Sequence, residues 1–264
     1  MPDARLTSAG TYDYALGGTA NTPAERRAVD TARTILPEFD DGIWANRGFV
    51  QRSVKRMAKD WGIRQFLDLG AGLPTQRNTH DVVAEVIPDG RVVYVDNEPA
   101  VVERGRKILA GHDRTVVIDA DIRNPDAVLS HPETQRLIDL SQPVGLLAAA
   151  VLHFVADEQD PWGIMARYVD AVPAGSYLAV SALTSDRQAD GVIGKVRRAV
   201  MSIPFHLRSR EQIERFFDGL EIVPPYKGAE PAVMHAGLWG AEDPEAANDD
   251  GSRWFYAAVG RKPG

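Results

Sequence analysis

The residues with the clearest chemical meaning lie in the segment RQFLDLGAGLPT, residues 64–75. An apolar run, which predicts a strand, ends in the turn Gly70-Ala71-Gly72, where glycines let a ligand approach the backbone closely. Asp68 lies two residues before the first glycine. A carboxylate there would repel a pyrophosphate and favours a ligand with positive groups, such as an ammonium and a sulfonium. We therefore expect Asp68, Gly70, Ala71 and Gly72 to bind a ligand of that kind.

Acidic residues also end the next two predicted strands. Asp96 follows the strand VVYV, and a carboxylate in that position can accept hydrogen bonds from both hydroxyls of a ribose. Asn97 comes directly after it, begins a predicted helix, and is included in the expected cofactor site. After the third strand, Asp121 can accept a hydrogen bond from an adenine amine while Ile122 packs on the ring. Together these residues predict an adenosine site.

The spacing also indicates which nucleoside is bound. A dinucleotide fingerprint requires a third glycine, but Thr75 occupies that position, after Pro74. This departure and Asp68 disfavour a nicotinamide-dependent oxidoreductase. The order acid-x-Gly-x-Gly, followed by acids that end strands two and three, is typical of class I S-adenosylmethionine-dependent methyltransferases. The predicted cofactor is therefore S-adenosylmethionine, with S-adenosylhomocysteine as product. The alternative is a tight turn beside solvent-facing strand ends.

A candidate catalytic residue follows the fourth predicted strand, where Leu152-His153-Phe154 reaches the rim of the sheet. His153 is the best-placed general base for removing a proton from the acceptor, because an ordinary imidazole titrates near neutral pH. Leu152 is expected among the cofactor-binding residues. The alternative role for His153 is to cap the strand or to hydrogen-bond beneath the cofactor. No His, Asp or Glu grouping has metal-ligand spacing, so no metal site is predicted.

Apolar runs that alternate with helical patterns from residue 64 onward predict a parallel sheet. The expected fold is α/β: a Rossmann-like class I methyltransferase fold with a seven-stranded, mostly parallel sheet and helices on both faces. The predicted strands are Gln65–Leu69, Arg91–Val95, Thr115–Asp119, Val144–Val151, Ser176–Ala182, Leu220–Val223 and Trp254–Val259.

Two helical patterns precede the sheet, at residues 24–36 and 49–61. We expect residues 1–62 to form an N-terminal helical extension that covers the cofactor. Residues 63–264 are expected to form the Rossmann-like catalytic domain that binds S-adenosylmethionine. No linker is strong enough to cut the chain, so the two parts are predicted to form a single structural domain.

The segment GVIGKVRRAVMSIPFHLRSR, residues 191–210, is a candidate lid over the acceptor. Apolar residues there alternate with a set of cations that predicts a cationic wall, selective for a small acidic or aromatic metabolite. The alternative is a solvated basic face on an amphipathic helix. His206 and His235 are candidates by position only. The cations are Lys195, Arg197, Arg198, Arg208 and Arg210.

Several blocks resemble the actinobacterial S-adenosyl methyltransferase family, long catalogued as a domain of unknown function. They are YDYALGGTANTPAERRAV (12–29), WANRGFVQRSV (44–54), GIRQFLDLGAGLPTQRNTHDVV (62–83) and RVVYVDNEPAVV (91–102). The resemblance extends over nearly the whole chain and implies a Rossmann-like methyltransferase fold that binds S-adenosylmethionine, with no substrate specified. One departure is Thr22, where family members tend to have phenylalanine.

The resemblance also gives a role to the N-terminal segment, which it implies folds over the cofactor. Tyr14 and Asn46 are expected to contact the cofactor directly. The alternative is that the tyrosines pack in the interior and Asn46 caps a helix. The segment further contains Tyr12, Asp13, Gly17, Gly18 and Asn21, and Arg47 follows Asn46.

Composition limits the remaining function classes. The chain has 264 residues and a net charge of −7, which argues against broad binding to nucleic acid or an anionic membrane. No Asn/Asp-Pro-Pro-aromatic sequence follows strand four, as amino-methylating nucleic-acid enzymes usually have. The absence of cysteine excludes disulfides, thiolate metal sites and cysteine nucleophiles. No signal peptide or membrane-spanning run is apparent, so we expect a soluble, cytoplasmic protein.

The combined prediction is an S-adenosylmethionine-dependent methyltransferase with a small-molecule acceptor, acidic or aromatic. Two alternatives share the same cofactor pocket. One is an enzyme that uses S-adenosylmethionine for cyclisation or aminopropyl-type transfer, and the other is a non-catalytic regulatory protein that binds the cofactor or its product.

Overall fold

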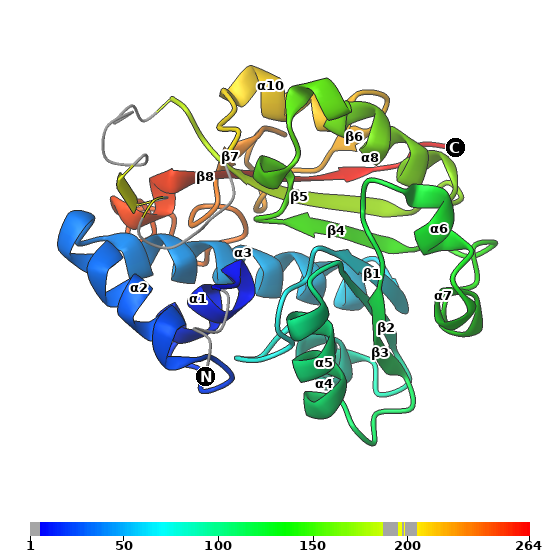
Figure 1. Cartoon of the computed structure of the whole chain (residues 1–264). Coiled ribbons are helices and arrows are strands. Elements are labelled where there is room, and N and C mark those ends of the chain that lie inside the picture. Colours follow the sequence, from blue (N-terminus) through cyan, green and yellow to red (C-terminus); the bar gives the residue numbers. More distant parts are fainter. Residues whose placement is uncertain (1–5, 187–194, 197, 199–204) are drawn as a thin grey trace.

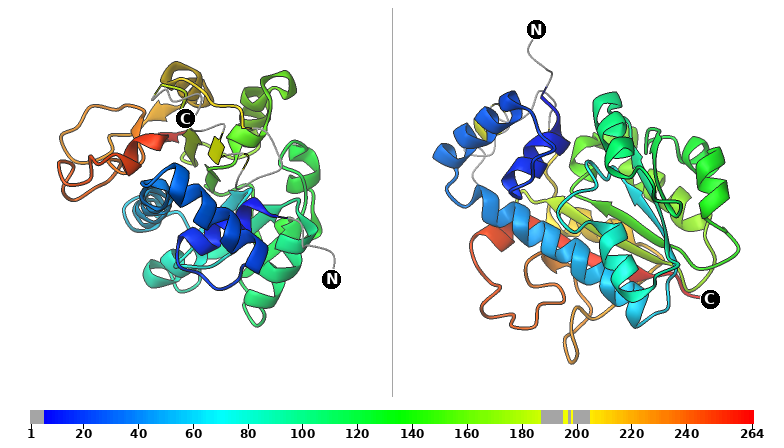
Figure 2. Two further views of the ribbon diagram at one scale, coloured as in Figure 1. Left: turned by 60° about the vertical axis from the view of Figure 1, so that its left-hand side comes forward. Right: turned by 90° about the horizontal axis from the view of Figure 1, so that it is seen from below.

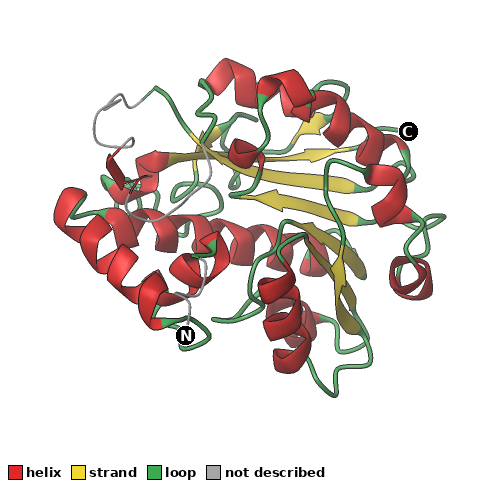
Figure 3. Ribbon diagram, in the orientation of Figure 1, coloured by secondary structure: helices red, strands yellow, loops and turns green. Residues whose placement is uncertain are grey.

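One twisted sheet runs through the protein with helices on both faces (Figures 1 and 3). The computed structural model describes residues 6–186, 195, 196, 198 and 205–264. The strand order is β3-β2-β1-β4-β5-β8-β6, and β7 pairs with β8. The strands are β1 (Gln65–Leu69), β2 (Arg91–Asp96), β3 (Thr115–Asp119), β4 (Gly145–Ala149), β5 (Tyr177–Leu183), β6 (Glu221–Ile222), β7 (Met234–His235) and β8 (Phe255–Arg261).

The first five strands are parallel, whereas β8 is antiparallel to β5, β6 and β7. The predicted mostly parallel α/β sheet is therefore present, with one strand more than expected. The additional strand is the two-residue β7, which lies within the long segment between β6 and β8.

Strands β1 and β4 lie side by side and both end in a left-handed turn. Gly70 follows β1 with φ +67°, and Ala150 follows β4 with φ +54°. Because of that turn, β4 ends at Ala149 instead of continuing to the predicted Val151. The amide of Ala150 still donates to the carbonyl and the hydroxyl of Ser181, at 2.9 and 3.1 Å. A left-handed alanine is strained, so these bonds must hold it in place.

Three helices precede the sheet: α1 (Ser8–Ala15), α2 (Pro23–Ile35) and α3 (Phe39–Lys59). The second helical pattern thus begins at Phe39, well before the predicted residue 49. The remaining α-helices are α4 (Thr79–Val86), α5 (Pro99–Ile108), α6 (Pro125–Leu129), α7 (Pro132–Leu137), α8 (Pro161–Asp170) and α10 (Arg210–Glu214). Short 3-10 turns are η1 (Leu152–Phe154), η2 (Asp157–Gln159), η3 (Arg215–Phe217) and η4 (Gly251–Trp254).

Polar side chains cap several helices at their N-termini. The side chains of Asn124 and Asp160 cap α6 and α8, and Ser209 forms the capping box of α10 with Gln212. At α5, however, Glu98 is the capping position and Asn97 lies outside the helix. The side chain of Asn97 is therefore available for another role.

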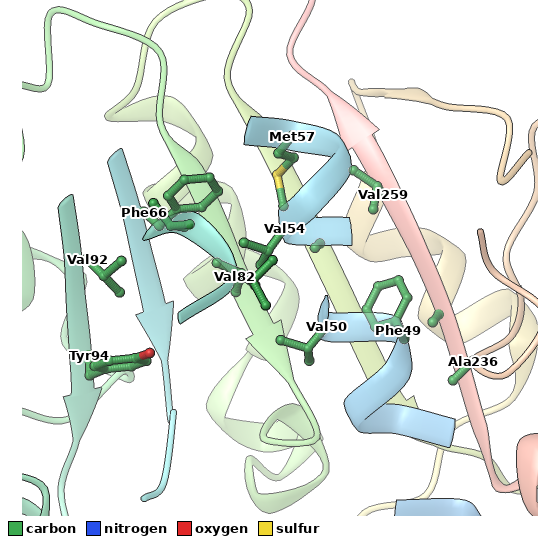
Figure 4. Packing of buried hydrophobic residues seen from close by; sticks show 14 of the residues in the cluster. Phe49, Val50, Val54, Met57, Phe66, Val82, Val92, Tyr94, Ala236 and Val259 are labelled. Carbon is green, nitrogen blue, oxygen red and sulfur yellow. The ribbon is translucent and has the colours of Figure 1, made fainter. Parts of the chain in front are cut away.

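The sheet separates two hydrophobic cores, because successive residues of each buried strand point to opposite faces. Phe66 of β1 packs into the core beneath α3, whereas Leu67 packs into the core beneath α8. In the first core, α3 presents Phe49, Val54 and Met57 to the sheet (Figure 4). Burial of this apolar face, rather than a cap at its N-terminus, fixes the long helix on the sheet, because Glu38 makes no side-chain capping bond.

Helices α1 and α2 lie beside the N-terminal half of α3 (Figure 2). A buried carboxylate joins this part to the rest of the protein. Glu25 accepts hydrogen bonds from the amides of Thr7 and Thr22 and pairs with Arg104 of α5. One side chain therefore connects α1, α2 and α5.

The predicted cationic lid, residues 191–210, lies mostly outside the described residues. Arg197 lies outside them, as does most of residues 187–204. The prediction that Arg208 belongs to a cationic wall over the acceptor is wrong. Its side chain is 1% exposed, donates to the carbonyls of Leu152 and Val155 at 2.7 and 2.6 Å, and pairs with Asp157. Arg208 thus fixes the loop that follows β4 and does not line a binding surface.

The other described cations of that segment lie near the surface. Lys195 and Arg198 are exposed, and Arg210 pairs with Glu214 one turn along α10. No helix within the described part of the chain is both long and apolar enough to cross a membrane.

Replacing Gly70 tests the turn after β1. The backbone at Gly70 is left-handed, which strains any residue with a Cβ atom, and that atom would also overlap Val151. Gly70→Ala should therefore lower the free energy of unfolding by roughly 2–5 kcal/mol. Gly62 has φ +71° but nothing within 4 Å of its Cβ position, so Gly62→Ala should cost only about 1–2 kcal/mol. Urea unfolding measures both. Equal losses of stability in Gly70→Ala and Gly62→Ala would show that Val151 does not restrict the turn.

Replacing Arg208 tests its role in the loop after β4. Arg208→Ala leaves two carbonyls and a carboxylate without their buried cation, and should cost about 3–5 kcal/mol in thermal or urea unfolding. The control is Arg210→Ala, which removes an exposed pair and should change stability by no more than about 0.5 kcal/mol. Similar small effects for both variants would contradict the structural role of Arg208.

Candidate functional site

A cavity of about 590 Å³ opens at the carboxyl ends of the parallel strands. It lies where the strand order reverses between β1 and β4, which is the usual ligand position in an open α/β sheet. Most of the predicted site residues line it: Asn46, Asp68, Gly70, Ala71, Gly72, Asp96, Asn97, Asp121, Ile122 and His153. The topology thus brings residues from five separate parts of the chain to one cavity, while Tyr14 and Leu152 are not among them.

Asp68 is buried at the end of β1, where its Oδ2 accepts a hydrogen bond from the hydroxyl of Thr79 at 2.7 Å. Burial raises the pKa of Asp68 to about 6, although the bond from Thr79 and the positive charge of Arg47 act in the opposite direction. The carboxylate is therefore poorly compensated by the protein itself. A cationic group placed beside it would favour its ionised form.

Asp96 holds the glycine turn. Its two carboxylate oxygens accept hydrogen bonds from the amides of Gly72 and Glu98, each at 3.0 Å, and burial raises its pKa. Each carboxylate oxygen can accept a second hydrogen bond. The side chain is therefore fixed in orientation and can still accept the two hydroxyls of a ribose, as the sequence predicts.

Asp121 and Ile122 line the cavity next to β3, beyond Asp96. The guanidinium of Arg123 binds Asp121, with Nε 2.9 Å from both carboxylate oxygens, and this bond lowers the pKa of Asp121. Asn97 also hydrogen-bonds to Asp121. Arg123 orients the carboxylate but competes for its oxygens, so Asn97 offers a second polar group for the edge of an adenine.

The prediction that Tyr14 reaches the site is wrong, and Tyr12 lies there instead. The two residues are two positions apart on α1, so they point to different sides of the helix. Tyr14 donates to Asp30 at 3.3 Å and lies beneath the guanidinium of Arg33, outside the cavity. The tyrosine pair was visible in the sequence, but the register of such a short helix was not.

Asn46 is buried at the centre of a chain of hydrogen bonds. Its Nδ2 donates to the hydroxyl of Tyr12 at 2.8 Å, and its Oδ1 accepts from the hydroxyl of Ser181. The hydroxyl of Tyr12 donates in turn to the carbonyl of Ile43. This chain connects α1, α3 and β5, so Asn46 positions the cavity wall as well as lining it.

Asp13 links α1 directly to the glycine loop. Its carboxylate accepts hydrogen bonds from the hydroxyl of Thr75, at 2.5 Å, and from the side-chain Nδ2 of Asn21, at 2.8 Å. Ala9 of the same helix lies 3.2 Å from the Cβ position of Gly72. The unusual blocks YDYALGG and Leu-Pro-Thr, which are far apart in the sequence, thus meet in space.

Arg47 is the main site residue for which the sequence predicted no specific role. It is 5% exposed, lines the cavity, and its guanidinium lies 5.4 Å from the ring centre of Tyr12. Its Nε has no hydrogen-bond partner within the described residues. A buried guanidinium with unused donor capacity is suited to bind an anionic group of a ligand.

His153 lines the cavity on the β4 side and is buried, in contact with the rings of Phe154 and Phe205. Burial lowers its pKa to about 3, with further contributions from the charges of Arg208 and His206. Its Nδ1 has no hydrogen-bond partner in the part of the chain that the structure describes. His153 is therefore a neutral imidazole that can accept or donate a hydrogen bond.

The prediction that Leu152 binds the cofactor is wrong, because its side chain is fully buried in the core beneath α8. Val151 lines the cavity instead, since the left-handed Ala150 shifts the alternation of side chains after β4. Within the described residues, no group of three or more His, Asp or Glu side chains is placed to hold a metal ion.

Comparison with known proteins shows which family this chain resembles. The family profile described as S-adenosyl methyltransferase matches residues 2–263. A protein of Thermobifida fusca YX, provisionally described as a methyltransferase, is 36% identical over 100% of this chain and 97% of its own, with TM-score 0.88. A DUF574 family protein of Streptomyces avermitilis MA-4680 is 38% identical over 98% of both chains, also with TM-score 0.88.

The mitomycin 7-O-methyltransferase is more distant, at 16% identity and TM-score 0.50 over 97% of this chain and 74% of its own, and shows the fold alone. No curated protein sequence matches the chain closely. The predicted fold class, the cofactor S-adenosylmethionine and the methyltransferase class are confirmed by these comparisons. Because the profile matches almost from end to end, the chain belongs to the S-adenosyl methyltransferase family.

Proposed function

We propose that this methyltransferase acts on a small-molecule acceptor, which it binds in the same cavity as S-adenosylmethionine. The observation that carries the proposal is the single cavity that joins Asp68, Asp96 and the glycine turn to His153. Its volume of about 590 Å³ falls within the range of roughly 300–1,000 Å³ that is usual for small-molecule sites.

The residues present fit S-adenosylmethionine. Gly70 and Gly72 form a turn that lines the cavity with backbone and has no room for a side chain at Gly70. Asp96 beside it is suited to the ribose hydroxyls. Asp68 can pair with the ammonium group of the cofactor. Arg47, with its unpartnered Nε, can bind the carboxylate. One anionic and one cationic side chain thus match the ammonium and carboxylate groups of the cofactor's methionine part.

We further assign the cover of the cofactor site to the N-terminal helical extension, residues 1–62. Tyr12, Asp13 and Ala9 of α1 line the cavity, and α1 is fixed to the glycine loop through Thr75. Residues 63–264 supply the catalytic part. This division agrees with the position of α1 over the end of the sheet in Figure 2.

When bound, S-adenosylmethionine supplies an electrophilic methyl group on a sulfonium. The protein's own part is to position the acceptor for in-line attack and to exclude water. We propose that His153 accepts a hydrogen bond from the group that becomes methylated. With a pKa of about 3 its imidazole stays neutral at physiological pH and is available as an acceptor, but it does not store the proton.

Calorimetric titration of S-adenosylmethionine, S-adenosylhomocysteine and NADH tests the cofactor site. The two adenosyl ligands should bind, and Asp96→Ala should weaken both by roughly 100-fold, since hydrogen bonds to a charged acceptor contribute roughly 1.5–3 kcal/mol each. Asp119→Ala is the control, because Asp119 is paired in register with Asp96 on β3 but is exposed. Binding of NADH alone, or an equal loss of affinity in the two variants, would refute the assignment of Asp96 to the cofactor site.

Asp68 predicts a pH dependence of cofactor affinity. Above about pH 6 its carboxylate is ionised and attracts the ligand's ammonium group, whereas below pH 6 a proton must first be displaced. Affinity for S-adenosylhomocysteine should therefore rise with pH and be about tenfold weaker near pH 5 than near pH 7.5. Asp68→Asn should bind weakly at both values. A wild-type affinity that does not change with pH would contradict this role.

The acceptor class is tested with S-adenosylmethionine labelled in the methyl group and an actinobacterial cell extract. A small-molecule acceptor predicts protein-dependent label in the fraction that passes an ultrafilter, with release of S-adenosylhomocysteine. Label retained on protein or nucleic acid would contradict the proposal. Cofactor binding without any transfer would instead favour a regulatory role.

A further inference from the structure

The cavity contains a second region that the cofactor contacts assigned above do not use. It is lined by the N-terminal half of α3, the η1 turn, the end of β5, the start of β8 and the loop residue Phe205. We call it the apolar chamber and define it by its large side chains, which are Phe39, Ile43, Phe154, Leu183, Phe205 and Phe255.

These walls come from distant parts of the sequence but are adjacent in space. Leu183 and Phe255 are register partners across β5 and β8. On the other side, the Cβ position of Gly42 in α3 lies 3.4 Å from Trp254, directly before β8. Figure 1 shows the same proximity of α3 to the segment that leads into β8. The chamber is therefore a feature of the assembled fold.

The chamber is apolar, and the described residues do not fill it. Phe39, Ile43, Phe154, Leu183 and Phe205 are only half-buried, although all of them line the cavity. Apolar surface in contact with water costs about 25 cal/mol per Å², so a ligand that covers these side chains gains free energy. Aromatic walls also favour stacked or edge-to-face contacts with a flat ring.

Among the described residues, the charged side chains lie in the other part of the cavity. The described charged side chains that line it come from α1, from Arg47 or from the ends of β1, β2 and β3; they are Asp13, Arg47, Asp68, Asp96, Glu98, Asp121 and Arg123. Arg47 lies one turn after Ile43 and marks the boundary, with its guanidinium directed to Tyr12. The chamber therefore suits an uncharged ligand.

His153 supplies a polar atom at this end of the cavity. Its ring centre lies 4.4 Å from Phe154, 5.3 Å from Phe205 and 6.4 Å from Phe255. Its Nδ1 is buried and lacks a hydrogen-bond partner within the described residues. A ligand that fills the chamber and carries a hydroxyl group would satisfy this nitrogen.

We infer that the apolar chamber binds the ring system of a flat, uncharged acceptor whose hydroxyl group donates a hydrogen bond to His153. The inference rests on the proposed function and narrows it from an acidic or aromatic metabolite to a neutral aromatic alcohol. In the transfer, the oxygen bonds to the methyl carbon as the carbon–sulfur bond breaks, and the sulfonium becomes a neutral thioether. The hydroxyl proton is released to solvent as the ether forms.

Three probes with one ring system test the chamber: 2-naphthol, 2-naphthoate and naphthalen-2-ylmethylammonium. Each is titrated calorimetrically into protein saturated with S-adenosylhomocysteine. The neutral 2-naphthol should bind at least about tenfold more tightly than either ion, because an unpaired charge is costly in an apolar site. Tighter binding of 2-naphthoate would assign Arg47 to the acceptor and overturn the inference, as would no binding of 2-naphthol.

Matched variants locate the binding. Ile43→Trp fills the chamber and should reduce 2-naphthol affinity by at least about tenfold, while Ile108→Trp, at an exposed position on α5, should not change it. Both variants should keep their affinity for S-adenosylhomocysteine, which also reports that they are folded. If Ile43→Trp also fails to bind S-adenosylhomocysteine, Leu183→Phe replaces it, because this substitution fills less of the chamber and allows the same comparison. Retained 2-naphthol binding in a variant that binds the product would overturn the assignment to the chamber.

A last comparison tests His153. Wild type should prefer 2-naphthol over 2-methoxynaphthalene, which lacks the donor, by about three- to tenfold. His153→Phe should remove the preference while S-adenosylhomocysteine still binds. An unchanged preference would refute the hydrogen bond. If S-adenosylhomocysteine does not bind the wild-type protein at all, the proposed function itself fails, which distinguishes that failure from failure of the chamber.

Discussion

The carboxylate of Asp96 makes the hydrogen bonds on which the site depends. By accepting the amides of Gly72 and Glu98, it joins the turn after β1 to the start of α5. The turn cannot be held by side-chain packing, because Gly70 has no room for a side chain beside Val151. A rigid glycine turn therefore requires a polar anchor, and Asp96 provides one from the neighbouring strand. The same carboxylate faces the cavity, so the structural anchor and the expected ribose contact are one group.

The electrostatics of the site favour binding at the expense of stability. Asp68 is buried and Asp96 is half-buried, and loss of contact with water raises the pKa of both carboxyls. Neither has a direct ion pair among the described residues, whereas exposed acids such as Glu85 are paired with arginine. Ionising buried, unpaired carboxylates is costly for the free protein. A cationic ligand offsets that cost, so the strain in the unliganded state becomes part of the affinity.

Most residues that the sequence predicted to bind the cofactor lie together in one cavity, because their sequence signals are local. Strand, glycine turn and terminal acid are read within a few residues, and Asp68, Asp96, Asp121 and Ile122 all line the cavity as predicted. The failures depended on information that is not local. Tyr12 replaces Tyr14 because the register of α1 is set by its docking on the glycine loop. Leu152 is displaced by the left-handed Ala150, and the basic appearance of Arg208 gave no indication that its guanidinium is buried beneath η1. The apolar chamber was missed for the same reason, since its walls come from four separate elements.

The attachment of α1 has a consequence for ligand exchange. Helix α1 covers the glycine turn with Ala9 and is connected through Asp13 to Thr75, and the adjoining Thr7 is connected through Glu25 to Arg104. A ligand held beneath this helix and the docking of the helix itself are therefore thermodynamically linked: each stabilises the other by the same free energy. Residues that never touch the ligand, such as Thr7 and Glu25, then contribute to its residence time.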